Sequence, residues 1–378
     1  MPNKDKNIPK RRFKAFENAD AWELRKLKLL FIFKYGDGNN NPSNGGPYPV
    51  FGAGGVQGGY TEYNSENSII IGHMGDAGCV SWGEGKHFVT YNGTITRPKE
   101  EVFTAKFGYY LLSKMNLRQY RGGSGLPFLT YDMLNDMDTI VPTNKSECDK
   151  ISEFFSTLDQ QITLHQRKLD KLKNVKQAYL SEMFPAEGER VPKRRFPGFT
   201  DAWELRKLGE VVYRSNITSS SKVLPRLEFE DINSGLGTLN KDIFQKVNDD
   251  RKGLEFNEGD VLFGKLRPYL KNWWYAEFNG IALGDFWNLK SDVWHSCFLY
   301  TYIQSNAFQL VANDTSGTKM PRSDWNLVAE SIAKFPSLPE QKAIGTFFST
   351  LDSQITLHQR KLEKLKNLKK ALLNELFV

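Results

Sequence analysis

The chain is short of cysteine and has no long apolar run. Among its 378 residues only Cys79, Cys148 and Cys297 are cysteine, far apart and without a CxxC spacing. Such cysteines argue against a disulfide framework or a zinc cluster and fit a reducing cytoplasm. No apolar run approaches the roughly 18 residues that a membrane-spanning helix needs. The first twelve residues are polar and basic, so neither a secretory signal nor a membrane partner is expected.

Recognisable catalytic motifs are also missing. The segment GDVLFGK at 259–265 has the spacing of a phosphate-binding loop, but Leu266 follows where Mg²⁺ binding needs Ser or Thr. GAGGVQG at 52–58 lacks the third glycine of a dinucleotide-binding loop. Asp76 with the Glu-Gly-Lys at 84–86 imitates a nuclease metal site, a pattern that is common by chance. The five histidines show no ligand spacing. We therefore predict no catalytic residue and no metal ligand.

The composition indicates a globular protein of two domains. Hydrophobic residues make up 39% of the chain, its mean hydropathy is −0.51, and its length can supply two separate cores. Lys and Arg total 51 against 44 acidic residues, a formal net charge of +7. This excess permits a polyanionic partner but does not prove one.

The chain contains an internal repeat. The segment FFSTLDQQITLHQRKLDKLKNVKQAYLSEMF, from Phe154, matches the segment from Phe347 at 24 of 31 positions. RRFKAFENADAWELRKL, from Arg11, likewise matches RRFPGFTDAWELRKL, from Arg194. Each half therefore has a basic RRF–AWELRKL segment, a variable insert and a nearly constant helix. The expected parts are a first domain at 1–150, a helix at 151–185, a second domain at 186–340 and a helix at 341–378.

The two inserts, at 35–131 and 213–325, share almost no sequence. A constant frame around unlike inserts favours two different recognition surfaces on one scaffold, and the alternative is a duplication that drifted. In the second insert, Lys265, Arg267, Tyr269 and Lys271 alternate with apolar residues. On a strand they would share one basic and aromatic face.

The repeated segments are expected to be two long helices that pair with each other. They lack Gly and Pro, and their apolar residues follow a heptad. Antiparallel pairing would match Lys176 with His358 and His165 with Lys369, whereas parallel pairing would bury lysine on lysine. The alternative is that the lysines extend to water and ignore the histidines. The predicted seam is Leu158, Ile162, His165, Leu169, Leu172 and Lys176 with Leu351, Ile355, His358, Leu362, Leu365 and Lys369. Helices of this length span about 45 Å, or about 13 base pairs, and would act as a ruler.

These features together resemble the specificity subunit of Type I restriction–modification systems, over essentially the whole chain. The doubled FFSTLD-x-QITLHQRKL segment looks like the two conserved spacer helices of that family. LPEQKAIGTFFSTLD at 338–352 matches the usual start of such a helix, and NKSECDKISEFFSTLD is a degraded version of it. YPVFGAGGVQGGY with IIIGHMGDAG resembles one class of target-recognition domain, and DVLFGKLRPYLKN followed by GIALGDFWNL resembles another.

The resemblance implies an α+β fold class. Two mixed α/β target-recognition domains would be joined by two long antiparallel coiled-coil helices, with a pseudo-twofold internal repeat. Each domain would read half of a bipartite site in the major groove of double-stranded DNA. The helices would dock two methyltransferase (modification) subunits that carry S-adenosylmethionine, and motor–nuclease restriction subunits that need ATP and Mg²⁺ join in such systems. The chain itself would be non-catalytic, would bind no cofactor and would act in the cytoplasm.

The resemblance also indicates where DNA would be contacted, although His73 stands where relatives often carry Arg or Lys. For any single Lys or Arg the alternative is a solvated surface charge. The candidate contacts are Gln57, Tyr60, His73, Arg121 and Ser124 in the first domain and Lys265, Arg267, Tyr269, Lys319 and Arg322 in the second. Three other functions stay open. They are the recognition subunit of a related bipartite-site enzyme whose partner carries both nuclease and methyltransferase, a stand-alone DNA-cleaving or methylating enzyme, and a coiled-coil scaffold without DNA function.

Overall fold

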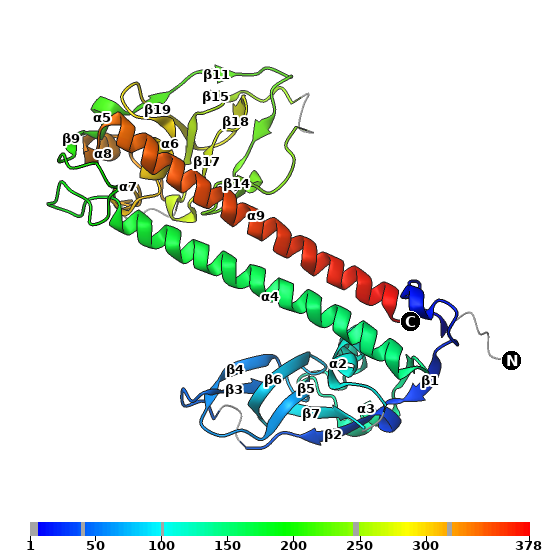
Figure 1. Cartoon of the computed structure of the whole chain (residues 1–378). Helices are drawn as coiled ribbons and strands as arrows, with labels where there is room; N and C mark the ends of the chain where they lie inside the picture. The colour runs from blue at the N-terminus through cyan, green and yellow to red at the C-terminus, as the bar shows by residue number, and fades with distance from the viewer. Residues whose placement is uncertain (1–6, 39–41, 100–101, 245–248, 316–319) are drawn as a thin grey trace. The chain divides into compact units, whose positions relative to one another are not determined.

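The computed structural model describes residues 7–38, 42–99, 102–244, 249–315 and 320–378 (Figure 1). It divides into two units. The first unit comprises the residues up to Leu164 together with Leu362–Val378, and the second comprises His165–Lys361. The long helices α4 (Lys145–Glu182) and α9 (Leu338–Leu376) each contribute one part to each unit. The chain is therefore a mixed α/β protein with an internal repeat, as the sequence predicts.

The first unit is built on a six-stranded sheet in the order β2-β7-β5-β6-β3-β4. Its strands are β2 (Phe31–Tyr35), β3 (Tyr48–Gly52), β4 (Gly55–Tyr60), β5 (Ser65–Gly72), β6 (Val80–Val89) and β7 (Gly93–Pro98). Neighbours are antiparallel except β3 and β6, which are parallel. Alternate residues of β5 point to opposite faces. Accordingly Ile69 and Ile71 enter the main core, whereas Ile70 packs with Phe51 on the other side.

The main core of the first unit needs both long helices. Helix α2 (Ala105–Lys114) starts at Thr104, whose hydroxyl accepts from the backbone N–H of Phe107. From α2, the ring of Tyr110 lies 5.1 Å from that of Phe155 on α4, and the ring of Phe107 lies 5.6 Å from that of Phe377. Residues 362–378 therefore complete a core that the chain begins more than 250 residues earlier.

The second unit carries two four-stranded sheets, with orders β10-β19-β16-β17 and β11-β15-β18-β12. The first sheet contains β10 (Tyr213–Ser215), β16 (Val261–Gly264), β17 (Trp273–Tyr275) and β19 (Phe286–Lys290). The second contains β11 (Thr218–Ser219), β12 (Arg226–Leu227), β15 (Gly253–Phe256) and β18 (Gly280–Ala282), and β13 (Ile232–Asn233) pairs with β14 (Thr238–Leu239). Helices α6 (Ser296–Tyr302) and α7 (Asn306–Ala312) supply Phe298, Tyr302 and Phe308 to a core rich in tryptophan.

The repeated AWELRKL sequence forms the same structure in both units. Its tryptophan, Trp22 or Trp203, is buried. Its ELRK forms β1 (Glu23–Lys26) or β9 (Glu204–Lys207), and one turn of helix follows, α1 (Leu27–Leu30) or α5 (Leu208–Val211). The partner strand, β8 (Asp138–Val141) or β20 (Ile332–Phe335), is antiparallel and follows a short helix, α3 (Tyr131–Asp136) or α8 (Trp325–Glu330).

Both long helices begin nine residues before the repeated FFSTLD sequence, α4 at Lys145 and α9 at Leu338. Pro339 is compatible with α9 because the first helical turn needs no donor from its nitrogen. Among the helices of the described ranges, none is long and apolar enough to cross a membrane.

Candidate nucleic-acid interface

The seam between the long helices is antiparallel within each unit. In the first unit Asp159 meets Lys369, and in the second Tyr179 meets Phe347 and Lys176 meets Asp352. Later residues of α4 thus meet earlier residues of α9. Every predicted seam residue is buried or half-buried.

The predicted register of this seam is wrong by about one heptad. Lys176 contacts Asp352, six residues before His358, and Lys369 contacts Asp159, six residues before His165. Both ion pairs are 2.6 Å long, and they are equivalent in the repeat. The observed register gives each partly buried ammonium a carboxylate, whereas the predicted one offers it only an imidazole. The lysines therefore do not simply extend to water.

The two seam histidines meet each other instead of the lysines. In the second unit the Nδ1 atoms of His165 and His358 lie 2.9 Å apart, a hydrogen bond that requires one ring to donate and the other to accept. Burial, followed by the neighbouring His165 and by Lys168 and Lys361, lowers the pKa of His358. The pair is accordingly held with at least one neutral ring.

The arginines of the repeated RRF sequence form ion pairs with the long helices. Arg12 makes a two-fold contact with Glu147, at 2.6 and 2.7 Å, and Arg195 makes the same contact with Glu340 at 2.7 Å. Both carboxylates are almost fully buried. The preceding arginines pair with the ends of the helices, Arg11 with Glu375 and Arg194 with Glu182. The arginines of this basic segment therefore hold it against the long helices and do not form a free cationic patch.

Each unit also presents two adjoining loops. In the first unit they are 73–78, after β5, and 121–128, before α3. In the second they are 265–271, after β16, and 320–323, before α8. Isolated antiparallel bridges join them, Met74 with Phe128 and Leu266 with Arg322. We call each set a loop pair.

The two loop pairs have equivalent backbone hydrogen bonds. His73 accepts from Leu129 at 2.8 Å, and Lys265 accepts from Ser323 at 2.9 Å. In addition, Gly75 donates to the carbonyl of Pro127 at 3.0 Å, as Arg267 does to that of Pro321 at 2.7 Å. The inserts therefore share a local frame despite their unlike sequences.

A glycine ends the strand that precedes each loop pair, and close packing explains it. A Cβ on Gly72 would lie 2.3 Å from the carbonyl oxygen of Asp76. One on Gly264 would lie 2.6 Å from the ring of Phe229 and 2.9 Å from the carbonyl oxygen of Asn272. Neither site accepts a side chain without a shift, so IIG-His-Met and LFG-Lys-Leu are equivalent sequences.

In the first unit the loop pair carries an exposed basic and apolar tip. Arg121 and Ser124 are exposed, as are Leu126 and Phe128. His73 is only 6% exposed, and its Nδ1 lies 3.0 Å from the carbonyl oxygen of Leu129. Its position therefore suits positioning of the loop better than direct contact.

Aromatic rings surround His73 in the first unit. The ring of Tyr35 lies 4.2 Å from that of His73 and 5.0 Å from that of Tyr131, and the ring of Tyr91 lies 5.7 Å from that of His73. Tyr91 and Tyr131 are themselves exposed. This cluster places stacking surfaces next to the loop pair, and no periodic pattern in the sequence indicates it.

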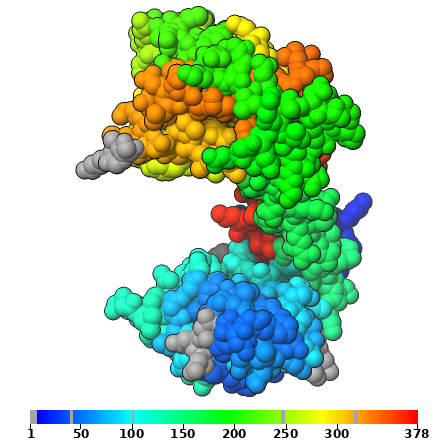
Figure 2. All heavy atoms as spheres, turned by 90° about the vertical axis from the view of Figure 1, so that its left-hand side faces the viewer, coloured from blue at the N-terminus to red at the C-terminus, as the bar shows by residue number. Residues whose placement is uncertain are grey.

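Gln57 and Tyr60 lie on the edge strand β4, apart from the loop pair in sequence. Gln57 is exposed, and half-buried Tyr60 packs its ring edge-on against Phe88 at 5.1 Å. The surface of this early part of the first unit is blue in Figure 2. Gln57 is exposed on this edge, whereas Tyr60 has a packing role.

In the second unit the predicted strand through Lys265, Arg267, Tyr269 and Lys271 is wrong. Strand β16 ends at Gly264, and 268–270 form a 3-10 turn. Proline removes a ladder donor, and Arg267 and Lys271 have positive φ values of 50° and 57°, so the alternation cannot be that of a strand. The turn exposes Arg267, Tyr269 and Lys271 together with Leu270.

The remaining cations of this loop pair share one carboxylate. Lys265 and Arg322 lie 3.5 and 3.0 Å from Asp285. Both retain partial exposure, so the pair can still face an anion. Lys319, the other predicted contact, lies outside the described residues.

The residues that imitate a nuclease site have separate partners. Asp76 pairs with Arg118 at 2.7 Å, and Glu84 pairs with Lys106 at 3.1 Å. A hydrogen bond from Trp82 and the pairing with Lys106 lower the pKa of Glu84. Within the described ranges no group of three or more His, Cys, Asp or Glu side chains is placed to hold a metal ion.

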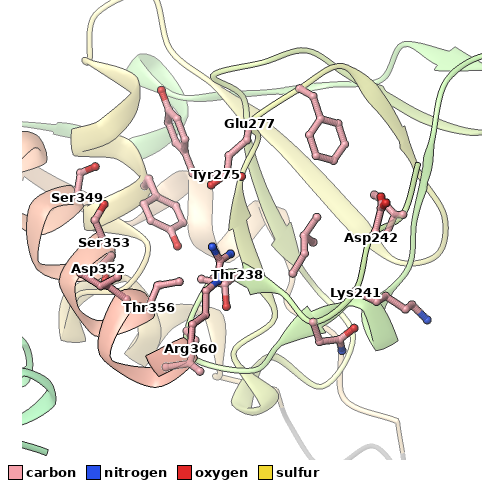
Figure 3. Close-up of a pocket in the computed structure, with 18 of the residues that line it drawn as sticks. Thr238, Lys241, Asp242, Tyr275, Glu277, Ser349, Asp352, Ser353, Thr356 and Arg360 are labelled. Atoms are coloured by element: carbon pink, nitrogen blue, oxygen red, sulfur yellow. The ribbon is translucent and has the colours of Figure 1, made fainter. Parts of the chain in front are cut away.

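A cleft of about 980 Å³ opens in the second unit between α9 and the segment 236–244. Figure 3 shows Ser349, Asp352 and Ser353 along one face of α9, with Lys241 and Asp242 across the cleft. Its lining carries both signs of charge. None of the predicted DNA contacts that the structure describes lines it.

The repeated frame corresponds to a domain of one known family, present in two copies. The profile of the family described as "Type I restriction modification DNA specificity domain" matches residues 19–174 and 200–367. The chain belongs to this family. It is a DNA specificity subunit with two target-recognition domains and is not itself an enzyme.

Two relatives illustrate the membership. The chain is 23% identical over 317 residues to the Type I restriction enzyme EcoDI specificity subunit of Escherichia coli, covering 73% of this chain and 70% of that protein. Its structure is similar to the crystal structure of the Type-I restriction-modification system S subunit from M. genitalium, with a TM-score of 0.73 and 17% identity. That match covers 98% of this chain and 99% of the other and shows the same fold.

Proposed function

We propose that the chain selects DNA for a Type I restriction–modification complex, with one half of a bipartite site bound by each target-recognition domain. The observation that carries this proposal is the contrast between the loop pairs. Their backbone frames are equivalent, but their exposed side chains differ, with Leu126 and Phe128 in one and Arg267 and Tyr269 in the other. Two loop pairs with equivalent backbones and unlike side chains suit two DNA half-sites of unlike sequence.

The repeated helices would dock two modification subunits and set the length of the unread middle of the site. The equivalent residues Leu164 and Leu357 are 51% and 49% exposed, on α4 in the first unit and α9 in the second. The repeat therefore presents equivalent helix surfaces twice, which suits two copies of one partner. S-adenosylmethionine would belong to those partners, as would ATP and Mg²⁺ to restriction subunits. The complex would act in the cytoplasm, where its DNA is found.

Mapping methylated adenines in the host genome tests the proposal. Cells with the gene should show a bipartite motif that disappears when the gene is deleted, and replacement of residues 213–325 by another insert should change only one half of the motif. An unchanged methylation pattern in the deletion strain would contradict the proposal.

A second measurement separates this function from that of a stand-alone enzyme. The purified chain, incubated with DNA, Mg²⁺ and S-adenosylmethionine, should neither cleave nor methylate the DNA. Methyl transfer should appear when the modification subunits are added. Transfer by the chain alone would argue for an enzyme in its own right.

A further inference from the structure

The two loop pairs carry different residues at one equivalent backbone position, Gly75 in the first unit and Arg267 in the second. Gly75 and Arg267 follow the bridging residues Met74 and Leu266, and each donates its N–H to a proline carbonyl. Both have positive φ, 85° at Gly75 and 50° at Arg267. Glycine adopts this region freely, whereas an L side chain meets steric resistance there. An arginine at this position is therefore unfavourable for the backbone alone.

Arg267 is held rigidly while its side chain extends into solvent. Its N–H donates to Pro321 at 2.7 Å, and its carbonyl accepts from Leu270 at 2.9 Å. Its side chain is exposed, and within the described part of the chain no hydrogen bond or ion pair of its guanidinium is found. Non-glycine residues in strained backbone conformations cluster at functional sites.

The neighbouring cations have other partners. Lys265 and Arg322 both pair with Asp285. A phosphate attracts any nearby cation and needs no fixed side chain, whereas the major-groove edge of a base selects a side chain placed in one orientation. A rigid backbone under a guanidinium that has no partner among the described residues fits the second requirement. Arginine binds the O6 and N7 atoms of guanine with two parallel hydrogen bonds.

We propose that Arg267 reads a guanine in the half-site bound by the second unit and is thus a specificity-determining residue. The first unit has Gly75 at the equivalent position, so it lacks this contact and reads its half-site with other side chains. The inference rests on the proposed function, because it assumes that the loop pair faces DNA.

Arg267→Gly tests the inference without straining the fold. Glycine tolerates the observed φ, so the melting temperature should stay the same or rise. The full chain with its modification subunits should then lose discrimination at one G·C pair of the second half-site, by roughly tenfold or more. Methylation of the other half-site should keep its sequence requirement. Arg267→Lys retains the charge but not the fork and should also lose discrimination.

Matched variants and salt dependence decide between the outcomes. Lys252→Gly removes an exposed cation elsewhere in the second unit and should leave the motif unchanged. Equal weakening on all DNA sequences by Arg267→Gly, with a shallower salt dependence and full rescue by Arg267→Lys, would assign Arg267 to a phosphate and overturn the inference. An unchanged motif, or loss of modification subunits from the complex, would also overturn it. Absence of any bipartite motif with the wild-type chain would instead reject the proposed function.

Discussion

Compared residue by residue, the first and second units keep the same ionic contacts along their helices and differ in the side chains of their loops. Arg12–Glu147 corresponds to Arg195–Glu340, and the seam pairs Asp159–Lys369 and Asp352–Lys176 correspond as well. The loop pairs keep only their backbone hydrogen bonds. Repetition in this chain therefore preserves what orients the helices and the loop backbone, and it leaves the exposed loop side chains free to change.

Breaking one buried Arg–Glu pair should produce the largest difference in stability between the two units. Glu147→Ala leaves the nearly buried guanidinium of Arg12 without its carboxylate, which should destabilise the first unit by about 3–5 kcal/mol. Glu340→Ala should do the same to the second unit through Arg195. Hydrogen exchange, followed separately in β5 and β16, would show which unit has been weakened.

Glu375→Ala is the matched control, because its pair with Arg11 is exposed and should contribute no more than about 1 kcal/mol. Replacing both Arg12 and Glu147 by apolar residues should recover much of the lost stability. Equal loss of protection in both units after Glu147→Ala would show that the pairs are not specific to their units.

Removing the seam lysines should destabilise the two units unequally, by less than loss of a buried Arg–Glu pair. Lys176→Met leaves Asp352 without its cation. Burial raises the pKa of Asp352, and the neighbouring Lys176 lowers it. We expect a loss of about 1–3 kcal/mol at neutral pH. The loss should shrink as the pH falls towards the raised pKa of Asp352, because a neutral carboxyl no longer needs the ammonium.

Lys369→Met is the corresponding change in the first unit and should cost less. Asp159 is more exposed than Asp352 and keeps a 2.9 Å hydrogen bond from the hydroxyl of Tyr110. Denaturant unfolding of both variants at pH 7 and pH 5 would measure the difference. A larger loss for Lys369→Met would refute this account of the seam.

The smallest expected effect belongs to the histidine pair, which exists only in the second unit. The pKa of His358 is lowered, so the unfolded chain binds a proton at a higher pH than the folded one. Stability should therefore be complete above about pH 6.5 and decline as the pH falls below it, by less than about 1 kcal/mol after screening.

The double variant His165→Gln/His358→Gln should flatten this decline in denaturant unfolding between pH 7.5 and 5.5. Exchange protection of β5, in the first unit, serves as the internal control and should be the same with and without the two substitutions. A decline of unchanged size in the double variant would assign it to other titrating groups.

The sequence predicted the repeated parts of the fold better than the inserts. The heptad and the 24 identities identified the helices, and the lysines within the seam favoured their antiparallel direction. The register was wrong because Asp159 and Asp352 lie next to the seam, and the heptad alone does not show that they partner the lysines. The sequence likewise did not show what the arginines of the RRF sequence contact, since their carboxylate partners lie 135 and 145 residues away.

Within the inserts, side-chain pattern was a poor guide to the site. The alternation from Lys265 to Lys271 suggested a strand, but Pro268 and two positive φ values make a turn. The equivalence of the loop pairs depends on backbone hydrogen bonds, which leave few traces in sequence beyond Gly72, Gly264 and the two prolines. His73 is a predicted contact residue, and only its burial beside Leu129 indicates a role in positioning the loop.

The composition of the first unit has a consequence for synthesis on the ribosome. Leu372, Leu376 and Phe377 belong to its core, although its sheet and α2 are translated much earlier. The second unit is one continuous stretch, His165–Lys361, and has all its core residues before those of the first are complete. The first unit is therefore the first to begin translation but the last to have all its core residues. Until residues 362–378 emerge, the nascent first unit exposes the apolar surface that they later cover.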